Sequence, residues 1–400
     1  MKKQPRATSD SLQLKRQEEL RASSRLRWRL SLKAVADGSG LLLALWAAQP
    51  ALAQGGGNGT FYVGTYAKNI LVLDEATMKV RDSIKVAAIP YAMTLSFNRQ
   101  HFYVLNPYVD SVEVIDIPTR KSLGTWTLSH DSIRVRMTGF NVDPLERYAV
   151  MVIKSTIKKK DRYEVGRPTL VRYDLTKKAK LDTIPWPNGQ EREGAQIIFA
   201  PKGDVMYFFT NEDVLVYDTQ TLKQVDKWDL SRTLYEEGIG RLGIGFGSDM
   251  YEDPGHYTNL FRYTDPVNHR NLMGVARMDL VNRTIEYFYT LGPSQGVSFS
   301  LAPGRTRAYG LFQQTGNYQF WSYDLEGRRV DRRVEFRGRP RMGLTVSTNG
   351  SQLYIGVAGP TIDRYDAKTF ELLGTTTLSG DMTRMILVPA GAAPRAGDRK

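Results

Sequence analysis

The sequence predicts an all-β fold, a seven-bladed β-propeller of four-stranded blades, from two observations. An apolar residue followed by aspartate closes a short β-rich segment seven times, at intervals of 42, 58, 44, 61, 45 and 42 residues. Several short β-rich segments, separated by turn residues, fill each interval. A base period of about 42–45 residues with several strands per unit is typical of propeller blades. The seven pairs are Leu73-Asp74, Ile115-Asp116, Tyr173-Asp174, Tyr217-Asp218, Met278-Asp279, Tyr323-Asp324 and Tyr365-Asp366.

One interval shows the four strands of a blade clearly. Residues 93–98 and 102–106 are expected to form strands a and b, and residues 111–116 and 123–129 to form strands c and d. Strand b is a nearly continuous apolar run, as expected for a strand packed between neighbouring blades. Strands c and d alternate between apolar and polar residues, as expected nearer the rim.

The predicted ring closes through both ends of the chain. Innermost strands a are expected near residues 93, 137, 195, 242, 296, 342 and 382. The repeats begin with a strand b at residues 60–64 and end with a strand a at residues 382–388. The closing blade is therefore expected to be shared between the N- and C-termini, which leaves no free sheet edge. The expected propeller spans residues 54–389, with a flexible tail at 390–400.

Residues 1–53 have the pattern of a signal peptide, which predicts a periplasmic location. Ten basic residues precede an apolar run at 41–48, and an Ala-x-Ala site ends at Ala53. That run is too short to cross a bilayer, so no membrane span is expected. Without this leader the net charge falls from +13 to +7, which is too small to indicate nucleic acid as the partner. The chain has no cysteine, which excludes disulfides, thiol nucleophiles and covalently attached haem c.

Strand order assigns each loop to one face of the predicted disc. Connections a–b and c–d share one face, and connections b–c and d–a share the other. The c–d turns are short, whereas four long insertions fall on the b–c/d–a face and one, at 247–256, on the other. Long loops gathered on one side of a scaffold indicate a working face, although neutral variation of surface loops gives the same pattern. The four insertions are at 154–168, 187–194, 231–241 and 264–272.

Basic residues on these insertions are the candidate docking face for a partner protein. A charge run on a loop is most often simply solvated, and docking of an acidic partner is the alternative. The candidates are Lys158, Lys159, Lys160, Arg162, Arg192 and Arg241.

No catalytic, cofactor-binding or metal-binding residue is predicted in this chain. His256 and His269 flank the expected strand b of the fifth blade and could converge, but two histidines are fewer than a transition-metal site needs. The seven aspartates are expected to accept backbone N–H groups in the c–d turns rather than to form a carboxylate site. Residues 238–243 match Gly-x-Gly-x-x-Gly, but no helix follows to make a dinucleotide site.

Several segments together resemble the β subunit of quinohemoprotein amine dehydrogenase. They cover residues 60–389, nearly the whole chain after the leader. They are Tyr62 to Tyr66 with Leu71 to Asp74, Phe102 to Asn106, Lys159 to Pro168 leading into Leu170 to Tyr173, Trp228 to Leu230, Phe261 to Tyr263, Met278 to Leu280, and the closing Leu378 to Met382.

The resemblance implies a non-catalytic propeller subunit of a periplasmic heterotrimer that oxidises primary amines. Its partners would be a dihaem cytochrome c subunit and a small subunit that carries cysteine tryptophylquinone, so both cofactors would lie outside this chain. The alternative is a stand-alone extracytoplasmic propeller that binds or scaffolds. A lactonase-like hydrolase is a third possibility, for which no cluster of acidic or histidine residues is evident.

Overall fold

The computed structural model describes the propeller and leaves several segments outside the description. The chain divides into residues 1–52 and 53–400, and only the second unit contains described residues. The predicted signal peptide, the 231–241 insertion with Arg241, residues 247–254 of the 247–256 insertion and nearly all of the predicted tail lie outside them. The described residues are 55–210, 213–229, 242–244, 255–265, 268–339, 343–356 and 359–391.

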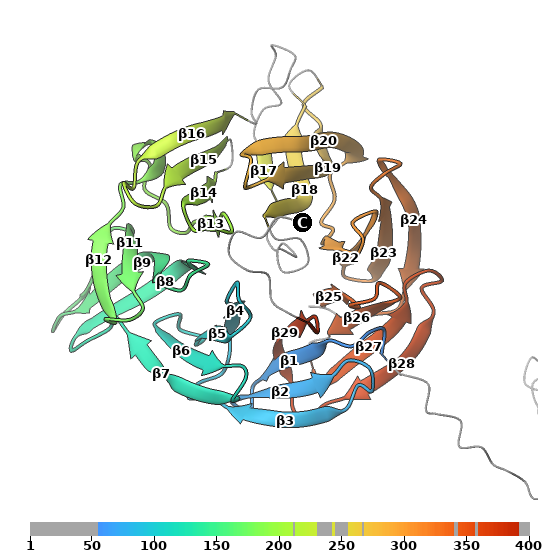
Figure 1. The fold of residues 1–400 in the computed structure, drawn as a ribbon, viewed down its shortest axis with the longest axis horizontal. Helices are drawn as coiled ribbons and strands as arrows, with labels where there is room; N and C mark the ends of the chain where they lie inside the picture. The colour runs from blue at the N-terminus through green and yellow to red at the C-terminus, as the bar shows by residue number, and fades with distance from the viewer. Residues whose placement is uncertain are drawn as a thin grey trace, which may run out of the picture. The chain divides into compact units, whose positions relative to one another are not determined.

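Seven antiparallel blades form a ring, with the first strand of each blade nearest the centre (Figure 1). Blade 1 contains β29 (Met382–Val388), β1 (Thr60–Thr65), β2 (Asn69–Asp74) and β3 (Val80–Lys85). Blade 2 contains β4 (Ala92–Leu95), β5 (His101–Leu105), β6 (Ser111–Asp116) and β7 (Lys121–Thr127). Blade 3 contains β8 (Ile133–Val142), β9 (Tyr148–Lys158), β11 (Thr169–Asp174) and β12 (Ala179–Thr183), with a further short strand β10 (Tyr163–Val165).

The remaining blades follow the same order. Blade 4 contains β13 (Gln196–Phe199), β14 (Val205–Phe209), β15 (Asp213–Asp218) and β16 (Gln224–Asp229), preceded by the single 3-10 turn η1 (Pro187–Gly189). Blade 5 contains β17 (Leu242–Ile244), β18 (His256–Thr264), β19 (Asn271–Asp279) and β20 (Thr284–Pro293). Blade 6 contains β21 (Ser300–Leu301), β22 (Arg307–Gln314), β23 (Asn317–Asp324) and β24 (Arg329–Phe336). Blade 7 contains β25 (Gly343–Val346), β26 (Gln352–Gly356), β27 (Thr361–Asp366) and β28 (Leu372–Thr377).

The predicted fold class and ring closure are confirmed. β29 pairs antiparallel with β1, with Thr60 opposite Val388 and Val63 opposite Met385. The C-terminal strand is therefore the innermost strand of a blade whose other three strands come from the N-terminal end. Among the described residues, no helix has the length and hydropathy that crossing a membrane requires.

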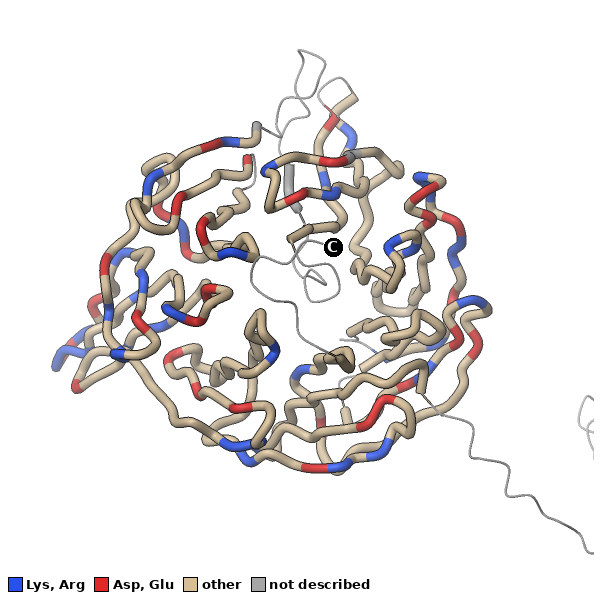
Figure 2. Tube along the Cα trace, viewed as in Figure 1, with Lys and Arg blue, Asp and Glu red and all other residues tan. Residues whose placement is uncertain are grey.

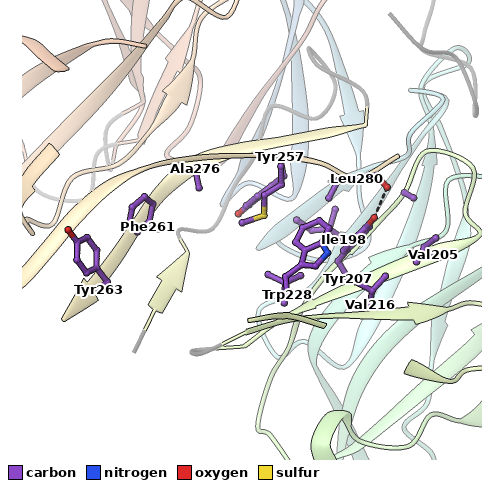
Figure 3. Packing of buried hydrophobic residues seen from close by; sticks show 13 residues of the cluster. Ile198, Val205, Tyr207, Val216, Trp228, Tyr257, Phe261, Tyr263, Ala276 and Leu280 are labelled. Atoms are coloured by element: carbon purple, nitrogen blue, oxygen red, sulfur yellow. Dashed lines mark hydrogen bonds between the residues drawn. The ribbon is translucent and has the colours of Figure 1, made fainter. Parts of the chain in front are cut away.

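Apolar side chains from neighbouring blades pack against each other and hold the ring together. Between blades 4 and 5, Tyr207, Trp228 and Tyr257 share one cluster, and the Tyr207 hydroxyl donates to the Leu280 carbonyl at 2.6 Å (Figure 3). Between blades 2 and 3, Trp126 stacks on a tyrosine of β11 at 4.3 Å between ring centroids. Burying each such side chain stabilises the fold by roughly 1.5–3 kcal/mol.

Blades 3, 5 and 6 rise above the others on the b–c/d–a face. In every blade the first residue of strand b pairs with the last residue of strand c, so all b strands start level. β9 has 11 residues, β18 has 9 and β22 has 8, whereas β5 has 5. At about 3.3 Å per residue, β9 is roughly 20 Å longer than β5.

Two of the insertions predicted as loops are therefore paired strands. In the 154–168 insertion β9 continues to Lys158 and β10 returns beside it, and in the 264–272 insertion Thr264 pairs with Asn271 across a short turn. The loop prediction was wrong because it gave no weight to the β-branched Thr156 and Ile157 or to the alternation of Tyr163 to Val165, which are typical of strands.

The repeated aspartates cap the c–d turns, as predicted. In all seven blades the carboxylate accepts a backbone N–H two or three residues further on. The N–H of Thr221 lies 2.7 Å from Asp218 Oδ1, and this hydrogen bond, helped by the Thr221 hydroxyl, holds the pKa of Asp218 below its usual value. The Thr369 N–H lowers the pKa of Asp366 in the same way.

Each c–d turn also contains a residue with a left-handed backbone, four positions after the aspartate. The residue is never glycine, so each turn retains strain that a Cβ atom causes. The seven are Met78, Arg120, Lys178, Leu222, Arg283, Arg328 and Phe370, with φ between 52° and 64°.

Replacing an exposed member of this set, Lys178, by glycine is expected to stabilise the protein. Lys178 has φ 52°, and a left-handed backbone costs an L-residue roughly 1–2 kcal/mol, whereas glycine costs roughly 0.5–1 kcal/mol in added freedom of the unfolded chain. Lys178→Gly should therefore raise the free energy of unfolding by about 0.5–1 kcal/mol in urea denaturation. Lys177→Gly, at the preceding turn residue without positive φ, should lower it, and equal effects of the two variants would refute the strain argument.

Candidate functional site

All seven blades contribute to a hollow of about 550 Å³ along the ring axis, six through their innermost strands or the adjoining residues and blade 5 through Tyr257 of β18. Most of its lining residues are apolar, but polar atoms make up about half of the exposed lining, with hydroxyl and amide groups from Thr94, Asn141, Gln196, Ser300 and Thr345. The apolar lining residues are Met93, Leu95, Phe97, Phe140, Val142, Pro144, Ile197, Ile198, Phe199, Phe299, Leu344, Met385, Ile386 and Leu387.

A second hollow of about 810 Å³ opens at the mouth of this channel. It is bordered by turns that strand order places on the b–c/d–a face, among them those that carry Tyr66, Pro107 and Gly359. Both hollows are lined by Leu344, Thr345, Arg384 and Met385, so the outer one leads into the inner one. The two joined hollows are called the funnel below, and these four shared residues its neck.

Two charged residues belong to the described lining of the funnel, and one of them reaches the inner hollow. Arg384, on β29, is the one charged residue among the described residues that line the inner hollow. Asp381 lines only the outer hollow. The Gln196 side chain donates to the Tyr257 hydroxyl at 2.8 Å, and burial raises the pKa of Tyr257 to about 12. Arg384 and Asp381 are the charged residues among the described lining of the two hollows.

Three exposed tyrosines of blades 1 and 2 lie on one side of the mouth. Tyr66 and Tyr91 border the outer hollow and are 61% and 58% exposed, and Tyr108, beside Pro107, is 75% exposed. The backbone fixes two of them, because the Tyr66 N–H donates to the Asp381 carbonyl at 3.0 Å and the Tyr91 N–H to the Leu105 carbonyl at 2.9 Å. Exposed aromatic residues on one face are typical of binding surfaces.

The tyrosines at the mouth of the funnel were not predicted as a site, although the sequence contains one signal for them. Tyr66 and Tyr108 lie in the b–c turns of blades 1 and 2, where small or polar residues are usual. A large aromatic residue in two successive equivalent turns could have indicated a surface for binding.

The predicted basic candidates of blade 3 lie together at the tip of its raised hairpin. Lys158 ends β9, and Lys159, Lys160 and Arg162 follow in the turn, all exposed. Acidic neighbours partly neutralise them, because Arg162 contacts Asp161 at 3.1 Å and Glu164 at 2.8 Å. Both signs of charge are in fact interspersed around the ring (Figure 2).

The structure brings a second predicted insertion against this hairpin. Arg192 lies on the 187–194 segment and is half-buried there. That segment is joined to blade 3 by the ion pairs Lys154–Glu193 at 2.6 Å and Arg167–Glu191 at 3.4 Å. Arg241 lies outside the described residues, so the predicted docking face as a whole stays a prediction.

His256 and His269 do not converge. His256 starts β18 and His269 follows its last residue, so roughly 30 Å of extended strand separates them and that possibility was wrong. His256 instead lies near Asp279 and Glu286, with ligand atoms within 4.8 Å of one another. Asp279 caps its c–d turn, and the Arg277 guanidinium contacts Glu286 at 2.5 Å. The Arg277 guanidinium thus offsets one of the two carboxylate charges, and Asp279 is already used in its turn.

His101 of blade 2 occupies the same repeat position as His256. It too starts strand b and contacts two carboxylates, Glu146 at 2.6 Å and Asp116 at 3.7 Å. The same pattern in two blades indicates that the histidine–carboxylate contacts belong to the structure of the repeat.

Comparison with known proteins identifies the fold. The sequence matches no protein-family model and no curated protein. A functionally unknown protein from Desulfotomaculum acetoxidans DSM 771 is 11% identical, with 84% of this chain and 100% of that chain covered and a TM-score of 0.52. Apo AztD from Citrobacter koseri is 14% identical, with 82% and 98% covered and a TM-score of 0.50. Similarity at these identities shows the fold alone, and together with the strand order it makes this chain a seven-bladed β-propeller.

Proposed function

We propose that this chain is a non-catalytic propeller subunit that receives a partner protein on its b–c/d–a face. The observation that carries the proposal is the patch of three exposed tyrosines beside the channel mouth, on the face toward which the long b strands of blades 3, 5 and 6 extend. Aromatic side chains are frequent energetic centres of protein interfaces. The lining of the channel supports a non-catalytic role, because its described side chains offer no acid–base pair.

The partner complex we propose is the periplasmic quinohemoprotein amine dehydrogenase that the sequence resembles. In it, a dihaem cytochrome c subunit and a small subunit with cysteine tryptophylquinone would carry out amine oxidation and electron transfer. This chain would provide a rigid wall of the assembly and no cofactor. Its lack of cysteine and its signal-peptide pattern support this assignment.

Purification from the native host tests the proposal directly. An affinity-tagged chain should co-purify with two further subunits, one with the absorbance of haem c, in a fraction that oxidises primary amines. Recovery of the chain alone, with no haem absorbance in any larger complex, would refute the proposal.

A stand-alone extracytoplasmic binding protein is the second candidate. The observation in its favour is the funnel, whose hollows of about 550 and 810 Å³ are of the size that small molecules occupy. The same purification separates the two candidates, because a stand-alone protein is recovered as a stable monomer with no partner.

Reversing the charges of the blade 3 hairpin tip is expected to slow assembly. In the variant with Lys158, Lys159 and Lys160 replaced by Glu, the association rate with the partner subunits should fall about tenfold at low salt, and the difference should shrink at 0.5 M salt. Its thermal stability should change little, because solvated surface charges contribute little to folding. The control exchanges Thr221 and Leu222, in the c–d turn of blade 4, for other turn-compatible residues. Loss of assembly in this control alone would place docking on the opposite face.

A further inference from the structure

The position of Arg384 suggests what the funnel holds. Its side chain lines both hollows and so stands at the neck, whereas Asp381 lines only the outer one. Arg384 is exposed, and within the described part of the chain it has no ion-pair partner. An exposed arginine without an ion pair, at the entrance of a hollow that has no acidic lining residue, attracts an anion from solution.

Hydrogen bonds and strand pairing hold this arginine in place. Arg384 pairs with Gly64 across the β1–β29 ladder, and the hydroxyl of the preceding Thr383 donates to the Pro90 carbonyl at 2.5 Å. The strand that carries Arg384 is therefore joined to blade 1 and to the entry of blade 2. The fixed backbone determines where the guanidinium can reach, and ligand binding has to order only the Arg384 side chain.

The walls beyond the neck match an apolar or aromatic body. Phe140, Phe299 and Met93 come from three different blades and line the inner hollow, together with the aliphatic Leu344 at the neck. Volumes of about 550 and 810 Å³ fall in the range of sites for small organic molecules.

We propose that the funnel binds a small organic anion, with a carboxylate or sulfonate on the Arg384 guanidinium and an aromatic or aliphatic body in the inner hollow. This site goes beyond the docking role and requires no partner subunit. A planar guanidinium offers two parallel N–H donors to such a group, which gives both strength and orientation.

An organic cation fits the same funnel less well. The exposed rings of Tyr66 and Tyr91 together with Asp381 could attract a cation at the rim. A cation that enters from the mouth must pass Arg384, however, and no acidic side chain among the described lining residues lies beyond the neck to stabilise it.

Binding of a fluorescent anion to the isolated full chain tests the proposal. 8-Anilinonaphthalene-1-sulfonate should bind saturably with one high-affinity site, and Arg384→Gln should weaken its affinity by about tenfold or more, the effect of losing a charge-assisted hydrogen bond. Arg384→Lys, which keeps the charge, should retain part of the affinity. The uncharged N-phenyl-1-naphthylamine should bind the wild type and Arg384→Gln equally.

Two further variants separate this site from general surface binding. Arg270→Gln removes one positive charge from the raised hairpin of blade 5, outside the funnel, and should leave the affinity for the anionic probe unchanged. Thr345→Trp fills the neck and should weaken binding of both probes. Each variant is checked for a cooperative thermal transition. If Arg384→Gln does not fold, the affinities of Arg384→Lys and Thr345→Trp for the two probes still test the site.

Competition then decides the charge of the ligand. Phenylacetate should displace the anionic probe, whereas 2-phenylethylamine, a cation of similar shape, should not. Displacement by the amine alone, equal anion binding by the wild type and Arg384→Gln, or an equal loss in Arg270→Gln would each overturn the proposal. None of these outcomes bears on whether a partner protein docks, which the native purification measures separately.

Discussion

A chain that ends at Asp381 is expected to lose the cooperative fold of the whole ring. Such a chain lacks β29, so blade 1 loses its innermost strand and β1 becomes an exposed edge. The cluster between blades 1 and 7 also loses Met382, Met385 and Leu387. The loss should exceed about 5 kcal/mol, which is comparable to the whole stability of many domains. Thermal unfolding followed by circular dichroism, with limited proteolysis, measures it.

A shorter truncation and a peptide provide the controls for this experiment. A chain that ends at Gly391 keeps β29 and should unfold like the full chain. A synthetic peptide of residues 379–391, added to the truncated chain, should restore part of the transition by pairing with β1. An unchanged melting temperature after truncation at Asp381 would contradict the closure described here.

Replacing Glu75 by alanine is expected to destabilise the protein by about 3 kcal/mol or more. Glu75 is fully buried beside the c–d turn of blade 1 and accepts hydrogen bonds from the Gly59 N–H at 2.7 Å and the Thr348 N–H at 3.0 Å. The Tyr354 hydroxyl donates to the same carboxylate at 3.1 Å. Alanine leaves these buried donors without an acceptor, and removing one member of a buried charged network costs about 3–5 kcal/mol. Urea denaturation gives the value.

The comparison variant for Glu75 is Glu326→Ala. Glu326 lies in the c–d turn of blade 6 and is exposed, so its replacement should change the free energy of unfolding by less than about 0.5 kcal/mol. Similar losses in the two variants would mean that the burial of Glu75 has no special role.

The Glu75 hydrogen bonds also hold the segment Gly55 to Gly59, where a Cβ atom on Gly57 would lie 2.0 Å from the Thr348 hydroxyl.

Much of the fold could be predicted from the sequence because the signals of a blade are local. The apolar residue before each aspartate, the alternation of strands c and d, and the capped turn all lie within about twenty residues of each other. Even the innermost strand of blade 6, which is only Ser300–Leu301, was expected near its place because the period fixes it. The raised hairpins were misread because polar residues inside their strands resemble those of loops.

The funnel could not be predicted in the same way, because its residues are distant in sequence. Tyr66, Leu344 and Arg384 come from three different segments and meet only when the ring has closed. No spacing rule relates positions on neighbouring blades that face a common axis. The buried Glu75 was accessible to sequence reasoning, however, since the residue after the repeated aspartate is apolar in five of the other six blades. Those residues are Ile117, Leu175, Leu280, Leu325 and Ala367, with Thr219 in the sixth.

The pairing of β1 with β29 has a consequence for the time course of folding. Thr60 and Val388 are more than three hundred residues apart in sequence, so the first strand to be synthesised completes its sheet with the last. Contacts of such long range form slowly, because the chain must lose the entropy of closing a large loop before the contacts can stabilise it. Until then β1 is an exposed edge strand. Its Phe61 and Val63, which are fully buried in the finished ring, are then left without part of their cover. The nascent chain therefore depends on rapid capture of its C-terminal strand, or on a chaperone that shields the edge, to avoid aggregation.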